Sequence, residues 1–66
     1  MKIVINGDEI EIDNNLSVGE VLKKLNLEDR VMAVALNMNI VKQDVWFEQR
    51  VSEGDKLEFL DFVGGG

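Results

Sequence analysis

The sequence contains one strong helix signal, and this single helix limits the folds that the chain can adopt. Ser17 stands three positions before Glu20, the capping-box pattern in which each side chain satisfies a backbone N–H at a helix start. Apolar residues then recur at the spacing of one helical face, at Val18, Val21, Leu22 and Leu25. We therefore predict one amphipathic helix over about Val18 to Leu25, which must cover whatever sheet the rest of the chain forms.

Strand-like sequence precedes this helix. Met1 to Asn6 is rich in β-branched residues, and Ile10 to Ile12 alternates apolar and acidic side chains. Between them, Asn6-Gly7 is a strong hairpin signal, because a type I′ turn needs positive φ at both central residues. The chain is therefore predicted to open with an antiparallel hairpin.

A second strand region follows the helix. Val31–Leu36 is continuously apolar, which favours a strand covered on both faces. We expect its larger side chains, Met32, Val34 and Leu36, to face the helix. Ile40-Val41 is predicted to form a short strand. The segment from Gln43 to Phe47 is predicted to be irregular or a single helical turn, with Trp46 or Phe47 filling the edge of the core.

The last predicted strand runs from Lys56 to Val63. If Leu57 and Phe59 face the helix, the alternation of a strand places Leu60 and Phe62 on the open side of the sheet. Two large apolar groups on a solvated face are typical of a contact surface. Ordinary scatter of surface hydrophobes is the alternative interpretation.

These elements together predict an α+β fold of the β-grasp, or ubiquitin-like, type. One helix covers one face of a mixed sheet of four to five strands, because no second helix exists to cover the other face. Residues 1–63 are expected to form a single domain, and residues 64–66 a flexible glycine tail. The three glycines end in a carboxylate, so the tail is either a presented chemical group or an idle terminus.

The composition excludes several classes of function. The chain has no cysteine and no histidine, which removes disulfides, most zinc sites, cysteine nucleophiles and serine–histidine triads. Its net charge of −6 argues against nucleic acid or an anionic membrane surface as partner. The charge suits a basic protein surface, or simply solubility. Without a signal peptide or a membrane-spanning run, the expected location is the cytoplasm.

The residues closely resemble the ThiS-type sulfur carriers of thiamin biosynthesis along the whole chain. The resemblance rests on Leu16–Glu20 at the helix start, on Val34–Asn37 followed by Ile40-Val41, and on Trp46, Gly54-Asp55 and the terminal glycines. Members of that family often carry proline after the Ile-Val pair, where this chain has Lys42. The resemblance implies that a ThiF-like adenylating enzyme activates the terminal glycine, that a sulfur donor converts it to a thiocarboxylate, and that a ThiG-like thiazole synthase receives the sulfur.

The expected roles follow from that chemistry. Gly66 is the candidate for modification, with Gly64 and Gly65 as the segment that threads into a narrow active site. Leu60 and Phe62 are candidates for partner docking, and the acidic residues Glu58 and Asp61 are candidates for steering toward a basic partner. We expect this chain to bind no metal or cofactor and to hold no catalytic residue. ATP and Mg²⁺ would be used by the partner, so the chain is a protein substrate and not an enzyme.

Three other functions remain compatible with the sequence. A sulfur carrier for another pathway, such as molybdopterin synthesis, shares the fold and the glycine end, although such carriers are commonly longer and proline-rich before the glycines. A non-catalytic β-grasp interaction module with an idle tail is a second alternative. A small enzyme is disfavoured by the absence of histidine and cysteine.

Overall fold

The computed structural model describes residues 1–61, apart from the side chain of Asp61. It contains five strands, one α-helix and one 3-10 helix. In chain order these are β1 (Lys2–Ile5), β2 (Asp8–Glu11), α1 (Val18–Lys24), β3 (Val31–Leu36), β4 (Asn39–Val41), η1 (Gln43–Val45) and β5 (Lys56–Asp61).

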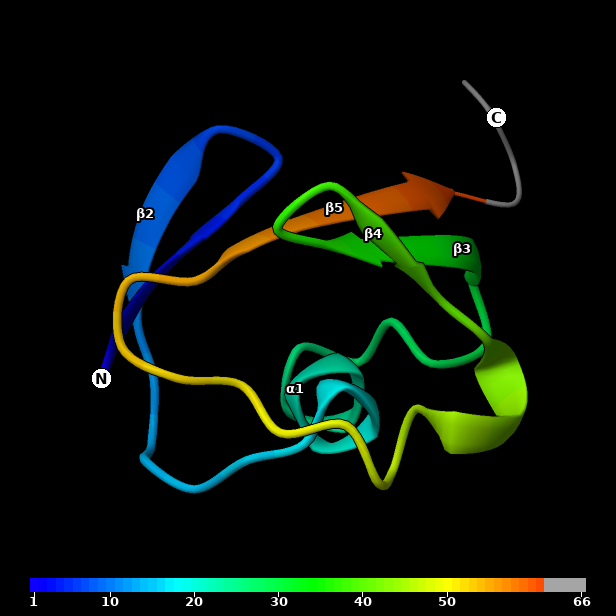
Figure 1. The fold of residues 1–66 in the computed structure, drawn as a ribbon, viewed down its shortest axis with the longest axis horizontal. Coiled ribbons are helices and arrows are strands. Elements are labelled where there is room, and N and C mark those ends of the chain that lie inside the picture. The colour runs from blue at the N-terminus through cyan, green and yellow to red at the C-terminus, as the bar shows by residue number, and fades with distance from the viewer. Residues whose placement is uncertain (62–66) are drawn as a thin grey trace.

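The five strands form one mixed sheet in the order β2-β1-β5-β3-β4. The pairing of β1 with β5 is parallel, and the other three pairings are antiparallel. The last strand of the chain is therefore the central strand of the sheet. Figure 1 shows α1 lying against one face of this sheet, while no other described element covers the opposite face. The predicted β-grasp architecture is confirmed.

The helix begins where the capping box predicts. The backbone N–H of Glu20 donates to Ser17 Oγ at 3.1 Å, and the backbone N–H of Ser17 donates to Glu20 Oε1 at 2.8 Å. The helix ends at Lys24, one residue earlier than predicted, and Leu25 forms its C-cap. Val18, Val21 and Leu22 are fully buried, so this face of the helix supplies the helical side of the core.

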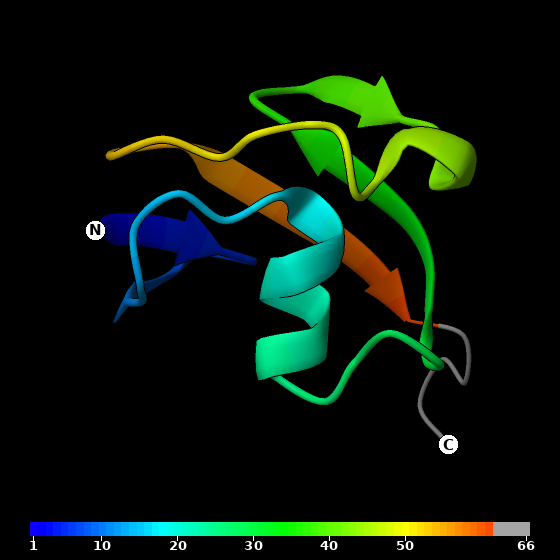
Figure 2. The same cartoon turned by 90° about the horizontal axis from the view of Figure 1, so that it is seen from below.

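The segment between η1 and β5 crosses the N-terminal end of the helix (Figure 2). The N–H groups of Val18 and Gly19 donate to the carbonyl oxygens of Gln49 and Trp46, at 2.9 and 2.8 Å. With the Ser17 cap, these bonds satisfy the donors that a helix start leaves free. Trp46 is only 4% exposed, and its Nε1–H donates to the carbonyl of Val41 at 2.9 Å. Its predicted packing role is confirmed.

The predicted orientation of β3 was wrong at Met32, whose side chain is 54% exposed. The pairing of β3 with β5 shifts register between Val31 and Ala33. This irregularity turns Val31 into the core beside Val34, both of them buried, and turns Met32 outward. Leu36 packs against the core as predicted, although it is only half-buried.

The predicted turns have the backbone that their residues favour. Asn6 and Gly7 have φ of 49° and 90°, and Gly54 has φ of 83°, so each glycine occupies a left-handed conformation that suits it. None of the helices in residues 1–61 combines the length and apolar character needed to cross a membrane.

Candidate functional site

The two faces of β5 differ as the alternation predicts. Leu57 and Phe59 are buried under the helix, whereas Leu60 is 60% exposed on the open face of the sheet. Glu58 shares that open face and is also exposed. A large apolar side chain therefore stands on solvated sheet one position before the strand ends at Asp61.

The neighbouring strands extend this apolar surface. Across the sheet, Ala33 lies opposite Leu60, and Ala35 lies opposite both Glu58 and Ile40. Ile40 is 73% exposed. The alanines are short and half-buried, so they leave a depression between Leu60 on β5 and Ile40 on β4.

This depression is a shallow hollow of about 300 Å³. It is lined by Ala33, Val34, Ala35, Ile40, Glu58, Phe59 and Leu60. Its lining is almost entirely apolar, with the Glu58 carboxylate as the single charged group. Such a surface can accept an apolar side chain of another protein and place a cation beside Glu58. We call it the sheet-face hollow.

Sequence reasoning found Leu60 and Glu58 but missed Ile40 and the two alanines of the hollow. The small residues at alternate positions of β3 were a usable signal, because they mark the face on which the strand leaves space. Ile40 had no such signal, since three residues are too few to establish which face of β4 it occupies.

Of the remaining predicted site residues, the structure describes only the backbone of Asp61. Asp61 is the last residue of β5, and its backbone pairs with Val31. Phe62, Gly64, Gly65 and Gly66 lie outside the described residues. The five residues after Asp61 can span at most about 18 Å when fully extended. A partner that acts on Gly66 must therefore contact the protein close to the end of β5, where the hollow lies.

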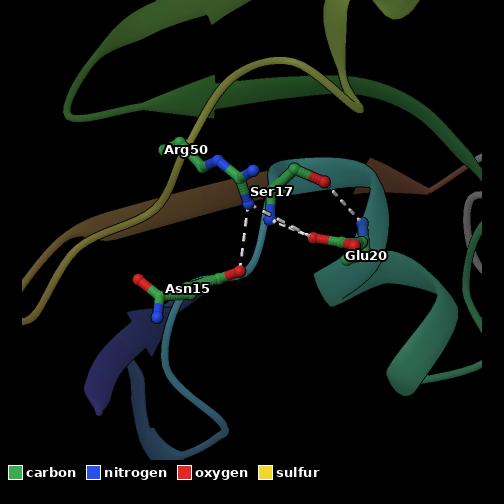
Figure 3. A network of polar contacts seen from close by, with 4 residues as sticks. All are labelled: Asn15, Ser17, Glu20 and Arg50. Atoms are coloured by element: carbon green, nitrogen blue, oxygen red, sulfur yellow. Dashed lines mark hydrogen bonds and ion pairs between the residues drawn. The ribbon is translucent and has the colours of Figure 1, made fainter.

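A polar network joins the start of α1 to the neighbouring loops, on the far side of the sheet from the hollow (Figure 3). Arg50 Nη1 donates to the carbonyl of Asn15 at 3.0 Å and lies 3.7 Å from Glu20 Oε1. The hydrogen bond from the Ser17 backbone is the main cause that lowers the pKa of Glu20 from its usual value of 4.5. Lys24 pairs with Asp13 at 2.5 Å and lowers the pKa of Asp13 through its hydrogen bond and charge. These contacts tie loops to the helix, and none of these residues lines the hollow.

Metal ligands are not gathered anywhere in the described part of the chain. Within residues 1–61, no group of three acidic residues is placed to hold a metal ion together.

Comparison with known proteins places the chain in a family. Residues 3–66 match the family model described as ThiS family. Over its full length the chain is 27% identical to the whole of the sulfur carrier protein ThiS of Escherichia coli (strain K12). It is also 39% identical over all 66 residues to part of a thiazole synthase of Paramagnetospirillum magneticum (strain ATCC 700264 / AMB-1). The chain spans one fifth of the length of that relative, 20%.

A solved structure agrees in fold as well as sequence. The crystal structure of a thiamine biosynthesis protein (ThiS) from Geobacter metallireducens superimposes with a TM-score of 0.83 at 33% identity. The superposition covers 100% of both chains. The chain therefore belongs to the ThiS family of β-grasp sulfur carrier proteins.

Proposed function

We propose that this chain carries sulfur as a thiocarboxylate on Gly66 and delivers it to thiazole formation in thiamin biosynthesis. The observation that carries the proposal is the full-length match to a ThiS structure at 33% identity, in a chain that ends in three glycines. Two of the relatives reported above are named for thiamin or thiazole synthesis, which favours this pathway over molybdopterin synthesis.

The chemistry begins with a carboxylate that is ionised at neutral pH and is a poor electrophile. One of its oxygens attacks the α-phosphorus of ATP, the bond to the β-phosphate oxygen breaks, and pyrophosphate leaves. The product is an acyl-adenylate. A sulfide equivalent then attacks the acyl carbon and AMP departs, which leaves the thiocarboxylate at Gly66. Since the chain has no cysteine, its carboxyl end is the group available to hold sulfur.

The catalytic parts come from the partners in this proposal. A ThiF-like adenylating enzyme supplies Mg²⁺, the phosphate-binding groups and access to the sulfur donor. The chain acts as its protein substrate. Glycines without Cβ atoms fit a narrow channel toward the nucleotide, which is the role assigned to Gly64 and Gly65.

Docking to that enzyme uses the sheet-face hollow. Leu60 and Ile40 offer apolar area on both sides of the hollow, and Glu58 offers a charge at its rim. The matching partner surface has an apolar side chain that enters the hollow and a lysine or arginine facing Glu58. Asp61 and Phe62, which follow Leu60 directly, extend the same docking segment toward the tail.

A ThiG-like thiazole synthase is the proposed sulfur acceptor. A thiazole synthase from P. magneticum contains a segment that is 39% identical to this entire chain. The presence of both sequences in one protein supports a functional link between the carrier and the synthase. The thiocarboxylate sulfur is then consumed in the reaction that builds the thiazole ring.

An intact-mass measurement tests the proposal. The protein is incubated with a ThiF-like enzyme, Mg-ATP and sulfide, and the mass is expected to rise by about 16 Da when sulfur replaces one oxygen. Fragmentation is expected to localise the change to Gly66. A variant lacking Gly65 and Gly66 is the control and is expected to fold normally and stay unmodified. An unchanged full-length mass, with an enzyme that modifies its own carrier, contradicts the proposal.

A further inference from the structure

Strand β5 continues beyond the end of its parallel neighbour β1. The paired positions between them are Val4 with Lys56 and Ile5 with Leu57. After Leu57, β5 extends for four more residues, to Asp61, while the chain of β1 turns away into the hairpin (Figure 1). On the side that faces β1, β5 therefore has no paired β1 residue beyond Leu57.

Beyond the end of β1, the side chain of Asn6 forms hydrogen bonds with the backbone of β5. Its Oδ1 accepts a hydrogen bond from the backbone N–H of Phe59 at 2.8 Å, and its Nδ2–H donates to the carbonyl of Phe59 at 3.4 Å. The amide thus contacts both backbone groups of one residue, as a neighbouring strand would. Asn6 has φ of 49°, a conformation that asparagine tolerates better than most residues.

On its other side, β5 pairs regularly with β3 as far as Leu60 and becomes irregular at Asp61. Leu60 pairs with Ala33 and Asp61 pairs with Val31, so the register shift falls between these two pairs. A shifted register disrupts the local ladder of hydrogen bonds. The Asn6–Phe59 contact therefore holds the β1 side of β5 beyond the last β1 pair, at Leu57, while β3 pairs with Leu60 and Asp61 on the other side.

We propose that Asn6 is a positioning residue for the terminal carboxylate. By fixing the backbone at Phe59, its amide sets the direction in which the chain leaves the sheet toward the active site of the adenylating enzyme. This inference rests on the proposed function. Attack on ATP needs the carboxylate oxygen within about 3.5 Å of the α-phosphorus. If the backbone of β5 at Phe59 is held loosely, the carboxylate spends a smaller fraction of its time at that distance.

Asn37 provides a matched control for Asn6. It also has φ of 49°, and its side chain also binds the segment of β5. Asn37 Oδ1 accepts from the Lys56 N–H at 2.9 Å, and Nδ2 donates to Asp55 Oδ1 at 3.0 Å. These contacts lie at the start of β5, on its β3 side, so their loss should cost similar stability without releasing the tail.

The test compares full-length Asn6→Gly with Asn37→Gly, because glycine accepts the left-handed backbone at both positions. Steady-state adenylation by a ThiF-like enzyme is followed through pyrophosphate release. Asn6→Gly is expected to lower kcat about five-fold with KM changed less than about two-fold, since Leu60 keeps its partner on β3. Asn37→Gly is expected to keep the wild-type kcat. Thermal melts of both variants establish that each is folded.

Hydrogen exchange of the free protein tests the anchor without any enzyme. The Phe59 amide, whose N–H donates to Asn6 Oδ1, is expected to exchange faster in Asn6→Gly and at the wild-type rate in Asn37→Gly. Wild-type exchange at the Phe59 amide in Asn6→Gly, or an equal kcat in both variants, overturns the role of Asn6. A wild-type chain that is not adenylated at all contradicts the proposed function instead, and the exchange result still decides whether Asn6 anchors the strand.

Discussion

The ring of Phe47 lies directly over the α-carbon of Gly19. A Cβ placed on Gly19 would come within 2.6 Å of the ring, a separation that packed atoms do not tolerate. Phe47 is nonetheless 53% exposed, so the ring covers the helix from outside instead of joining the core. The glycine in the first turn of α1 therefore permits this close contact between the helix and the loop that carries Phe47.

Gly19→Ala is expected to lower the free energy of unfolding by about 1 kcal/mol, because displacement of the ring outweighs the better helix propensity of alanine. In a Phe47→Ala background the same substitution is expected to stabilise the protein by up to about 1 kcal/mol. Urea unfolding of the four proteins of this cycle measures both values. If Gly19→Ala has the same sign in both backgrounds, the ring is not the reason for the glycine.

Lys42 has the backbone of a proline. Its φ and ψ are −65° and 147°, and proline locks φ near this value. The backbone at Lys42 is therefore compatible with the proline that the family resemblance led us to expect at this position. Lys42→Pro is expected to raise the free energy of unfolding by about 0.5–1 kcal/mol by restricting the unfolded chain. A loss of stability in thermal melts would show that the Lys42 N–H is needed in the folded protein.

Acid should weaken the helix start. The pKa of Glu20 is lowered in the folded state relative to 4.5, first by the hydrogen bond from the Ser17 backbone. A lowered folded pKa stabilises the protein above the unfolded value, and this contribution is lost as the pH falls below 4.5 through the folded pKa. Glu20→Gln keeps an acceptor oxygen without the titration, so its stability should fall less over this range.

Asp13→Asn tests the second lowered pKa in the same way, because Lys24 lowers the pKa of Asp13 below 3.8. Its effect should appear at lower pH than that of Glu20→Gln. Unfolding curves recorded at intervals between neutral pH and the acid limit of the fold measure both. Curves for the two variants that run parallel to wild type throughout would contradict the assigned causes.

Leu60→Asp tests the sheet-face hollow. The substitution is expected to weaken binding to a ThiF-like enzyme by at least about ten-fold, since a charge would enter an apolar contact. The free energy of unfolding should change by no more than about 0.5 kcal/mol because the side chain is largely exposed. Met38→Asp is the control, because Met38 is also a large apolar residue, is 88% exposed and does not line the hollow. Equal loss of binding in both variants would place the contact elsewhere.

Local signals in the sequence predicted the parts of the fold that local chemistry determines. The Ser17–Glu20 capping box and the Asn6-Gly7 turn depend on residues within a few positions of one another, and both were correct. Met32 was misplaced because its orientation depends on a register shift against β5, almost thirty residues later in the chain. No nearby residue marks such a shift.

The residues of the candidate site also divide into those that local sequence predicts and those that depend on distant strand pairing. Leu60 and Glu58 follow from simple alternation along β5, and the structure places them on the open face. Ile40 enters the hollow only through its pairing with Ala35, which a short segment of sequence does not reveal. Asn6 was recognised as a turn residue, yet its amide contacts with Phe59 depend on the parallel pairing of the first and last strands. The roles of Phe62, Gly64, Gly65 and Gly66 stay predictions.

Transfer of labelled sulfur tests the central claim most directly. The protein is thiocarboxylated with heavy-isotope sulfide, purified, and added to a ThiG-like thiazole synthase with the other thiazole precursors. The account predicts that the heavy sulfur appears in the thiazole and that the protein returns to its carboxylate mass. Unlabelled thiazole, or a carrier that keeps its heavy sulfur while thiazole accumulates, would contradict it.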